Sequence, residues 1–180
     1  GGLAMDTVSS DAVVCHAMDY IETRTDERYD AVMLLEPTAP FATHEDYDRA
    51  VRMMIDHDAN VVVGMKAVTI NSVFQGPMDD KGRIGSIVRK LSGLRGLRRQ
   101  DVPQEYTMNG ALYLMKWDFF KAHRQRYCDS EHTYGVVMKP AYSVEIDEMM
   151  DFEFAKFLVD RGHVDVSYWK TAMAKQVARA

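Results

Sequence analysis

The sequence predicts an α/β fold with a mostly parallel sheet. Short, continuous apolar runs of strand length alternate along the chain with longer stretches whose apolar residues recur at helical spacing. A run without polar alternation is typical of a strand that is covered on both faces, as in a parallel sheet. The chain has 180 residues, 47% of them hydrophobic and 27% charged, which fits one soluble domain.

The first half of the chain contains a helix followed by a strand–helix–strand unit. Apolar residues at helical spacing predict a helix over Ser10–Arg24. Ala31–Leu35 and Asn60–Met65 are apolar runs of the buried-strand type. Between them, Thr43 and Asp46 form a capping-box pattern that predicts the start of a second helix. We expect this unit to be a right-handed βαβ crossover.

The second half begins with a long interruption of the pattern. Turn signals and basic residues occupy Lys66–Met108, and a loop-rich stretch of this length is usually functional or interfacial. Beyond it the patterns predict a strand over Gly110–Met115, a helix over Trp117–Arg126, a strand over Val136–Met138, a helix over Met149–Arg161, a short strand over Val164–Tyr168 and a helical tail over Lys170–Ala180.

Composition narrows the function classes. A net charge of −5 gives no sign of a nucleic-acid-binding surface. No run of 18 apolar residues and no signal-peptide pattern occur, so we expect a soluble, cytoplasmic protein that does not interact with a membrane. Cys15 and Cys128 are too few for a disulfide framework, and neither they nor the six histidines have metal-site spacing.

Glu145 and Asp147 are the candidate metal ligands. In an extended chain, side chains two residues apart point to the same side, so both carboxylates would share one face. Two such groups can bind Mg²⁺ and leave room for a substrate phosphate. Spacing alone favours the alternative of two solvated acids on an exposed strand, since charged side chains are mostly exposed.

Four segments in sequence order carry a resemblance to a known family. They are Asp6–Ser10 (DTVSS), Leu34–Phe41 (LLEPTAPF), Arg98–Tyr113 (with RRQDVP and NGALY) and Ser143–Phe152 (SVEIDEMMDF). They resemble the DTASS, LLQPTSPL, RRQ-x-LP with NGAIY, and S-I-D-I-D-x-x-x-D-F motifs of the acylneuraminate cytidylyltransferases, the CMP-sialic acid synthetases and their relatives. Each motif is weak alone, but the four occur in the family's order.

The resemblance implies a Rossmann-like nucleotidyltransferase fold with a protruding dimerisation arm. The family joins CMP from CTP to a sialic-acid-like nonulosonic acid and releases pyrophosphate, with Mg²⁺ as the cofactor. By this resemblance, residues 1–65 and 109–161 form the catalytic core, residues 66–108 form the arm of a homodimer, and residues 162–180 form a C-terminal tail that we expect to be helical.

The resemblance also assigns roles to individual residues. Glu145 and Asp147 match the metal-binding acids, and Asp147 and Arg99 are the expected catalytic residues. Ser9 and Ser10 match the family's serines near the cytidine, and the expected sugar-pocket residues are Glu36, Asn109 and Tyr113. Simpler roles stay open for several of these positions. Ser9 and Ser10 are also good helix N-caps, Glu36 could be a bare loop acid, Tyr113 a core residue and Arg99 a solvated charge.

The sequence departs from the family pattern at several positions. Glu36 stands where the family has Gln and puts a negative charge near a sugar carboxylate, while Ala42 and Thr107 stand where arginines are usual. Glu145 replaces the more frequent Asp. We find no Gly-rich, Arg- or Lys-bearing loop for the CTP phosphates and expect the chain to begin part-way into the pattern. Two alternatives therefore stay open: a nucleotidyltransferase for another sugar or sugar phosphate, and an inactive, N-terminally truncated fragment.

Overall fold

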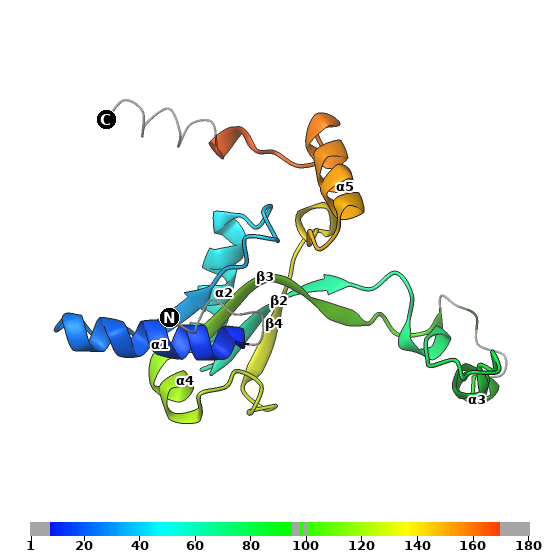
Figure 1. Ribbon diagram of the computed structural model, residues 1–180, viewed down its shortest axis with the longest axis horizontal. Helices are drawn as coiled ribbons and strands as arrows, with labels where there is room; N and C mark the ends of the chain where they lie inside the picture. Colours follow the sequence, from blue (N-terminus) through cyan, green and yellow to red (C-terminus); the bar gives the residue numbers. More distant parts are fainter. Residues whose placement is uncertain (1–7, 95–97, 99–100, 170–180) are drawn as a thin grey trace. The chain divides into compact units, whose positions relative to one another are not determined.

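The computed structural model describes residues 8–94, 98 and 101–169 (Figure 1). The chain divides into two compact units. The core unit comprises Gly1–Met65 and Met108–Ala180, and the inserted unit comprises Lys66–Thr107. The helix predicted over Lys170–Ala180 lies outside the described residues. No helix in the described part of the chain is both long enough and apolar enough to cross a membrane.

The first two helices begin at side-chain caps. Helix α1 spans Ser10–Arg24, as predicted, and the hydroxyl of Ser9 accepts a hydrogen bond from the Ala12 N–H at 3.2 Å. Helix α2 spans His44–Asp56 and begins at the predicted capping box, in which Thr43 and Asp46 bond each other's backbone N–H. Both helix starts are therefore confirmed.

One sheet of four strands forms the centre of the core unit. The strands are β1 (Ala31–Leu34), β2 (Val61–Ala67), β3 (Tyr106–Lys116) and β4 (Thr133–Val137), in the spatial order β1-β3-β2-β4. Strand β1 pairs antiparallel with β3, with Leu34 opposite Tyr113, whereas β2 and β4 pair in parallel. The sheet is therefore mixed.

The prediction of a mostly parallel sheet was wrong because β3 runs against its neighbours. The Lys116 N–H donates to the Asn60 carbonyl at 2.9 Å, and a Cβ on Gly64 would lie 3.4 Å from the Leu112 nitrogen. Residue numbers therefore decrease along β3 in the direction in which they increase along β2, so the two strands are antiparallel. Strands β1 and β2 are not neighbours, since β3 lies between them. An apolar run reports that a strand is buried on both faces and does not report its direction.

The remaining elements differ from the prediction mainly at their ends. Helix α4 (Trp117–His123) stops before Arg126, because Arg124 adopts a left-handed conformation with φ of 56°. A short 3₁₀ helix, η3 (Pro140–Tyr142), precedes helix α5 (Met149–Asp160). The strand predicted over Val164–Tyr168 was wrong: Val164–Val166 is irregular, and the side chain of Val164 is buried against α5 residues instead.

Each face of the sheet has its own hydrophobic core. On one face, α2 residues Ala50 and Met54 pack with Val62 and Leu112. On the other face, residues of α1 and α4 pack with neighbouring positions of the same strands; they are Val14, Met18, Val61, Val63, Met115, Trp117 and Phe120. Burial on both faces explains the continuous apolar runs in the sequence.

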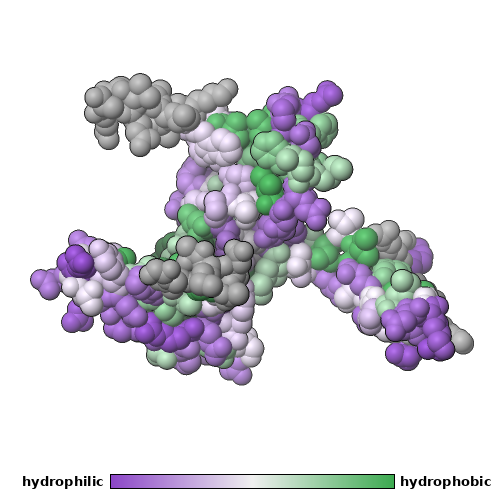
Figure 2. Space-filling view, in the orientation of Figure 1, coloured by the Kyte–Doolittle hydropathy of each residue, from purple (hydrophilic) through white to green (hydrophobic). Residues whose placement is uncertain are grey.

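Helix α5 rests on a third, smaller cluster. Its Ala155 and Leu158 are buried with Phe41, Val144 and Val164. Its larger apolar side chains are exposed instead, and Figure 2 shows the hydrophobic surface that gathers over this helix; they are Met149, Met150, Phe152, Phe154 and Phe157. The buried cluster places the segment before α5, which includes Val144, against the core.

The inserted unit contains a 3₁₀ helix, η1 (Ser72–Phe74), and helix α3 (Gly85–Ser92). The carboxylate of Glu105 accepts hydrogen bonds from the backbone N–H and the hydroxyl of Ser72, both at 2.7 Å. None of its described residues is buried, and several of them are large and apolar: Ile70, Phe74, Met78, Ile84, Val88 and Leu91. The described part of this unit is therefore held by polar contacts and has no buried core of its own.

Candidate active site at the carboxyl edge of the sheet

The carboxyl ends of β1, β2 and β4 lie at the same edge of the sheet, because these three strands run in the same direction. Glu36 follows β1 at this edge, and the loop of Ser143–Asp147 follows β4 by way of η3. The Ile146 N–H donates to the Thr38 carbonyl at 2.8 Å and joins the two loops. Ligands in α/β folds bind at such an edge.

Asn109 anchors the loop that carries the two acids. Its side chain is fully buried, and its amide nitrogen donates to the Ser143 hydroxyl at 3.2 Å and to the Met138 sulfur at 3.1 Å. The Ser143 hydroxyl in turn donates to the Lys139 carbonyl at 3.0 Å. The structure places Asn109 beneath the loop, so its amide acts within the protein. A substrate contact by Asn109, which the motif implies, stays a prediction.

Glu145 is half-buried and lies against Gly110 of β3. A Cβ at position 110 would be 2.4 Å from Glu145 Oε1, so the carboxylate occupies the space that any larger residue would fill. Asp147 is exposed, and its backbone N–H donates to the Asp151 carboxylate at 3.1 Å. Ser143–Asp147 is not a strand, so the expected sharing of a face through strand alternation does not apply.

The two carboxylates are suitable ligands for a hard cation. No described basic side chain forms an ion pair with either of them. Within the described residues no group of three or more His, Cys, Asp or Glu could hold a metal. Mg²⁺ is often bound by one or two carboxylates together with water and substrate phosphates, and the donors present here fit that pattern.

A second group of residues surrounds Tyr113, which lies on β3 three residues beyond Gly110. The two groups are thus about 10 Å apart along the strand. Burial raises the pKa of Tyr113 to about 12, and the neighbouring Tyr127 and the charge of Glu36 act in the same direction. Tyr113 therefore keeps a neutral hydroxyl, which can donate a hydrogen bond at physiological pH.

The start of α1 belongs to this second group. Ser9 is the N-cap of α1 and Ser10 its first residue, and both are exposed. The next residue, Asp11, accepts hydrogen bonds from the Nε and the backbone N–H of Arg126, at 2.5 and 3.3 Å. The guanidinium of Arg126 lies over the Tyr113 ring, 4.4 Å from its centroid.

Arg99 and the first two residues of the DTVSS segment lie outside the described residues. Arg126, Asp11 and Ser143 were not predicted as functional contacts. A lone arginine at the end of a predicted helix, or an acid in a first helical turn, gives no sequence signal of a contact between distant segments. Ser143 was noted only as the first residue of a motif.

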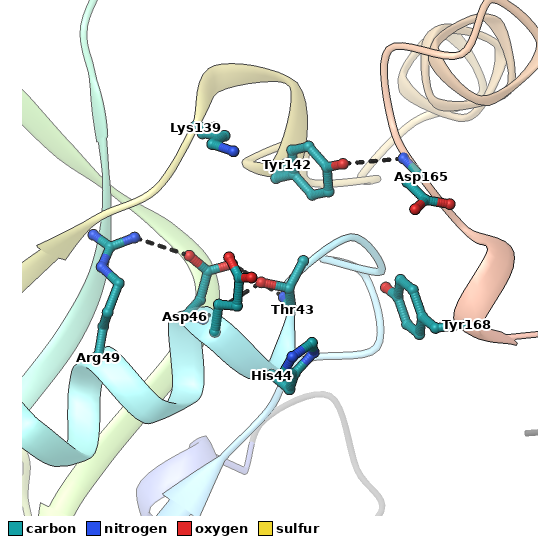
Figure 3. A pocket seen from close by; sticks show the side chains of 9 residues that line it. Thr43, His44, Asp46, Arg49, Lys139, Tyr142, Asp165 and Tyr168 are labelled. Atoms are coloured by element: carbon teal, nitrogen blue, oxygen red, sulfur yellow. Dashed lines mark hydrogen bonds and ion pairs between the residues drawn. The ribbon is translucent and has the colours of Figure 1, made fainter.

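A pocket of about 280 Å³ lies beside the site, on the side of α2 (Figure 3). Tyr142, which contributes to its wall, directly precedes Ser143, but none of the predicted site residues lines this pocket. Its lining is polar and mixed in charge: Thr43, His44, Glu45, Asp46, Arg49, Lys139, Tyr142, Asp165 and Tyr168. Several of these groups bond each other, as Asp46 does with Thr43 and with Arg49. The pocket is therefore separate from both groups described above.

Comparisons with known proteins agree with the four motifs. No family model matches the chain. It is 28% identical over 159 residues to the N-acylneuraminate cytidylyltransferase of Escherichia coli O18:K1:H7 (strain RS218 / NMEC), covering 85% of this chain and 34% of the relative. It is 24% identical over 157 residues to the post-translational flagellin modification protein B of Campylobacter coli, covering 87% of this chain and 64% of that protein. The chain resembles the acylneuraminate cytidylyltransferases.

The resemblance is confirmed, but the chain spans less than two thirds of the length of either relative. The structure is also similar to that of 4-diphosphocytidyl-2C-methyl-D-erythritol synthase from Anaerococcus prevotii, with a TM-score of 0.54 over 86% of this chain and 68% of the other. The sequences are only 10% identical, so this likeness shows a shared α/β fold and nothing about the substrate.

Proposed function

We propose that the protein is a cytidylyltransferase that joins CMP from CTP to a sialic-acid-like nonulosonic acid and releases pyrophosphate. The observation that supports this most is the setting of Glu145 and Asp147. They lie in a family-like motif, and they have no ion-pair partner among the described residues. Their loop is held by the buried amide of Asn109 and by the Thr38 carbonyl.

The proposed reaction is an in-line transfer. A sugar hydroxyl attacks the α-phosphorus of CTP, the bond from that phosphorus to the pyrophosphate oxygen breaks, and the hydroxyl proton passes to solvent water. Positioning and charge neutralisation carry most of the catalysis in such transfers. Mg²⁺ held by Glu145 and Asp147 would offset phosphate charge and lower the pKa of the sugar hydroxyl. Glu145 and Asp147 would be its protein ligands because both are hard oxygen donors on one loop at this edge.

Other residues would bind and orient the substrates. The Tyr113 hydroxyl is neutral and would donate to the sugar. Arg99 would pair with a carboxylate or phosphate through two hydrogen bonds. Ser9 and Ser10 would contact the cytidine at the start of α1, where backbone N–H groups point outward.

We also propose that the inserted unit is the arm of a homodimer. Apolar side chains such as Ile84, Val88 and Leu91 are exposed along α3 and its N-cap, and no described residue of this unit is buried. Exposed apolar side chains that gather on one helix are typical of a protein–protein interface. A second copy of the chain is the simplest partner.

Glu36 favours a second candidate substrate. It is half-buried, and its charge acts on Tyr113, where a sugar carboxylate would be repelled. A neutral sugar would avoid this repulsion. The protein would then be a nucleotidyltransferase for another sugar without a carboxylate, and a substrate panel that also includes sugar phosphates separates the candidates.

The test measures pyrophosphate release from CTP and Mg²⁺ with nonulosonic acids, neutral sugars and sugar phosphates. We expect turnover with a nonulosonic acid, loss of turnover with EDTA and recovery with Mg²⁺. Glu145→Gln and Asp147→Asn should each lower kcat/KM by about 100-fold or more, while Glu153→Gln, an exposed acid on α5, should not change it. No pyrophosphate with any substrate, or full activity of both acid variants, would refute the proposal.

A further inference from the structure

Arg126 is a buried cation that pairs with the carboxylate of Asp11. Only 6% of the residue is exposed, and it lies in the turn beyond α4. Asp11 accepts the Arg126 Nε–H at 2.5 Å on one oxygen and its backbone N–H at 3.3 Å on the other. One residue of the first turn of α1 thus fixes both the backbone and the guanidinium of Arg126. Loss of one partner would leave a buried charge without compensation.

The guanidinium also lies over the rings of two tyrosines. Its Cζ atom is 4.4 Å from the centroid of the Tyr113 ring and 5.7 Å from that of Tyr127. A cation at this distance is attracted by the ring and covers one of its faces. A ligand therefore cannot stack on that face of Tyr113.

We propose that Arg126 is a positioning residue that holds Tyr113 at a fixed distance from the first turn of α1. This inference rests on the proposed function, in which Tyr113 orients the sugar and Ser9 and Ser10 contact the cytidine. The chain Asp11–Arg126–Tyr113 joins these two substrate sides through one ion pair and one ring contact. Transfer between two bound substrates depends steeply on their separation and alignment.

Arg124 supplies a matched control. It also lies beyond α4 and also pairs with α1, through Asp19 at 3.0 Å. That pair is exposed, with about half of each side chain accessible, and no ring contact joins Arg124 to Tyr113 among the described residues. Loss of Arg124 therefore removes an α1 ion pair without changing the surroundings of Tyr113.

The first test needs no substrate. Tyrosines are labelled with ¹³C at Cζ, Tyr113→Phe assigns the Tyr113 signal, and amide exchange is measured at Ala12 and Val13. We expect Arg126→Gln to shift the Tyr113 signal and to speed exchange at both amides, while Arg124→Gln changes neither. Arg126→Lys, which keeps the charge but not the planar group, should give a smaller shift. It replaces the Gln variant in the comparison if circular dichroism shows that the Gln variant does not fold.

The second test uses steady-state kinetics. Arg126→Gln should raise KM for the sugar acid and for CTP and lower kcat, with a fall in kcat/KM of about ten- to a hundredfold. Arg126→Lys should recover part of this loss, and Arg124→Gln should match the wild type. A wild type without turnover refutes the proposed function, while the tyrosine signal still reports the coupling. The inference is overturned if Arg126→Gln and Arg124→Gln move the Tyr113 signal alike, or if that signal moves and the kinetic constants do not.

Discussion

Gly110 shows at the scale of one residue how the site depends on an absent side chain. Its φ of +68° is a conformation that residues with a Cβ rarely adopt. The space where its Cβ would be is filled by the carboxylate of Glu145, whose Cδ atom would lie 2.9 Å away. The Asn-Gly pair in the sequence therefore has two functions, since Asn109 anchors the acid loop from below and Gly110 admits Glu145 beside it.

Gly110→Ala should lose activity beyond its cost in stability. Gly162 is the matched control, because its φ is +71° and no atom lies within 4 Å of its would-be Cβ. Both Ala variants should lose about 1–2 kcal/mol in free energy of unfolding from backbone strain. Only Gly110→Ala should displace Glu145 and abolish Mg²⁺-dependent pyrophosphate release. Urea denaturation and the release assay measure the two effects, and equal activity of both variants would contradict the assigned role of Gly110.

Asp129 should make stability depend on pH in the acid range. Its carboxylate accepts hydrogen bonds from the Asn60 amide at 2.8 Å and from the backbone N–H groups of Glu131 and His132 at 3.1 Å, and these bonds lower its pKa to about 2. A lowered folded-state pKa adds stability above the ordinary value of about 3.8 that is lost as pH falls toward 2.

Thermal unfolding between pH 5 and 2 tests this expectation, with roughly these limits set by the two pKa values. The melting temperature of the wild type should fall more steeply than that of Asp129→Asn, which cannot titrate. Parallel curves for the two proteins would show that this carboxylate has an ordinary pKa.

At the scale of elements, sequence patterns predicted the helix starts and strand positions that depend on neighbouring residues. The bounds of α1 and the capping box of α2 follow from neighbouring side chains, and all four strands lie within the apolar runs or overlap them. The direction of β3 and the irregular Val164–Val166 segment depend on partners far away in the chain, so no window of sequence contains them. Helix α5 shows the same limit. The spacing of its apolar residues predicts a helix, but does not predict that the smaller ones, Ala155 and Leu158, are the buried ones.

The residues of the candidate site also fall into those that the sequence could predict and those that it could not. Glu36, Glu145 and Asp147 could be found because they follow strands at the carboxyl edge and belong to motifs. Asp11 and Arg126 are 115 positions apart, and their pairing exists only in the folded chain. The burial of Asn109 also has no local signature, since an asparagine before a glycine is typical of an exposed turn.

At the scale of the whole molecule, the inserted unit is a long connection between two adjacent strands. The Asn109 amide lies 3.5 Å from the Met65 carbonyl, so the chain returns beside the point from which it left. Replacement of Lys66–Thr107 by Asn-Gly, the sequence of a tight hairpin turn, should therefore leave the core unit folded. The shortened protein should be a monomer if the inserted unit is the dimer arm.

Circular dichroism and light scattering after gel filtration measure the two outcomes. Val88→Asp, which keeps the inserted unit but puts a charge among the exposed apolar side chains of α3, should also weaken the dimer. An unfolded core would show that the inserted unit stabilises it, and a dimeric shortened protein would place the interface elsewhere.

The position of β3 in the sheet has a consequence for the folding kinetics of the chain. It pairs with β1 and β2, and it is separated from β2 by all of Lys66–Thr107. Closing so long a loop costs conformational entropy before any ladder hydrogen bond forms, so we expect the pairing of β3 to be a late step. Asn109, Gly110 and Tyr113 all lie on this strand. A partly folded chain, even one with α1 and α2 in place, would therefore have no binding site.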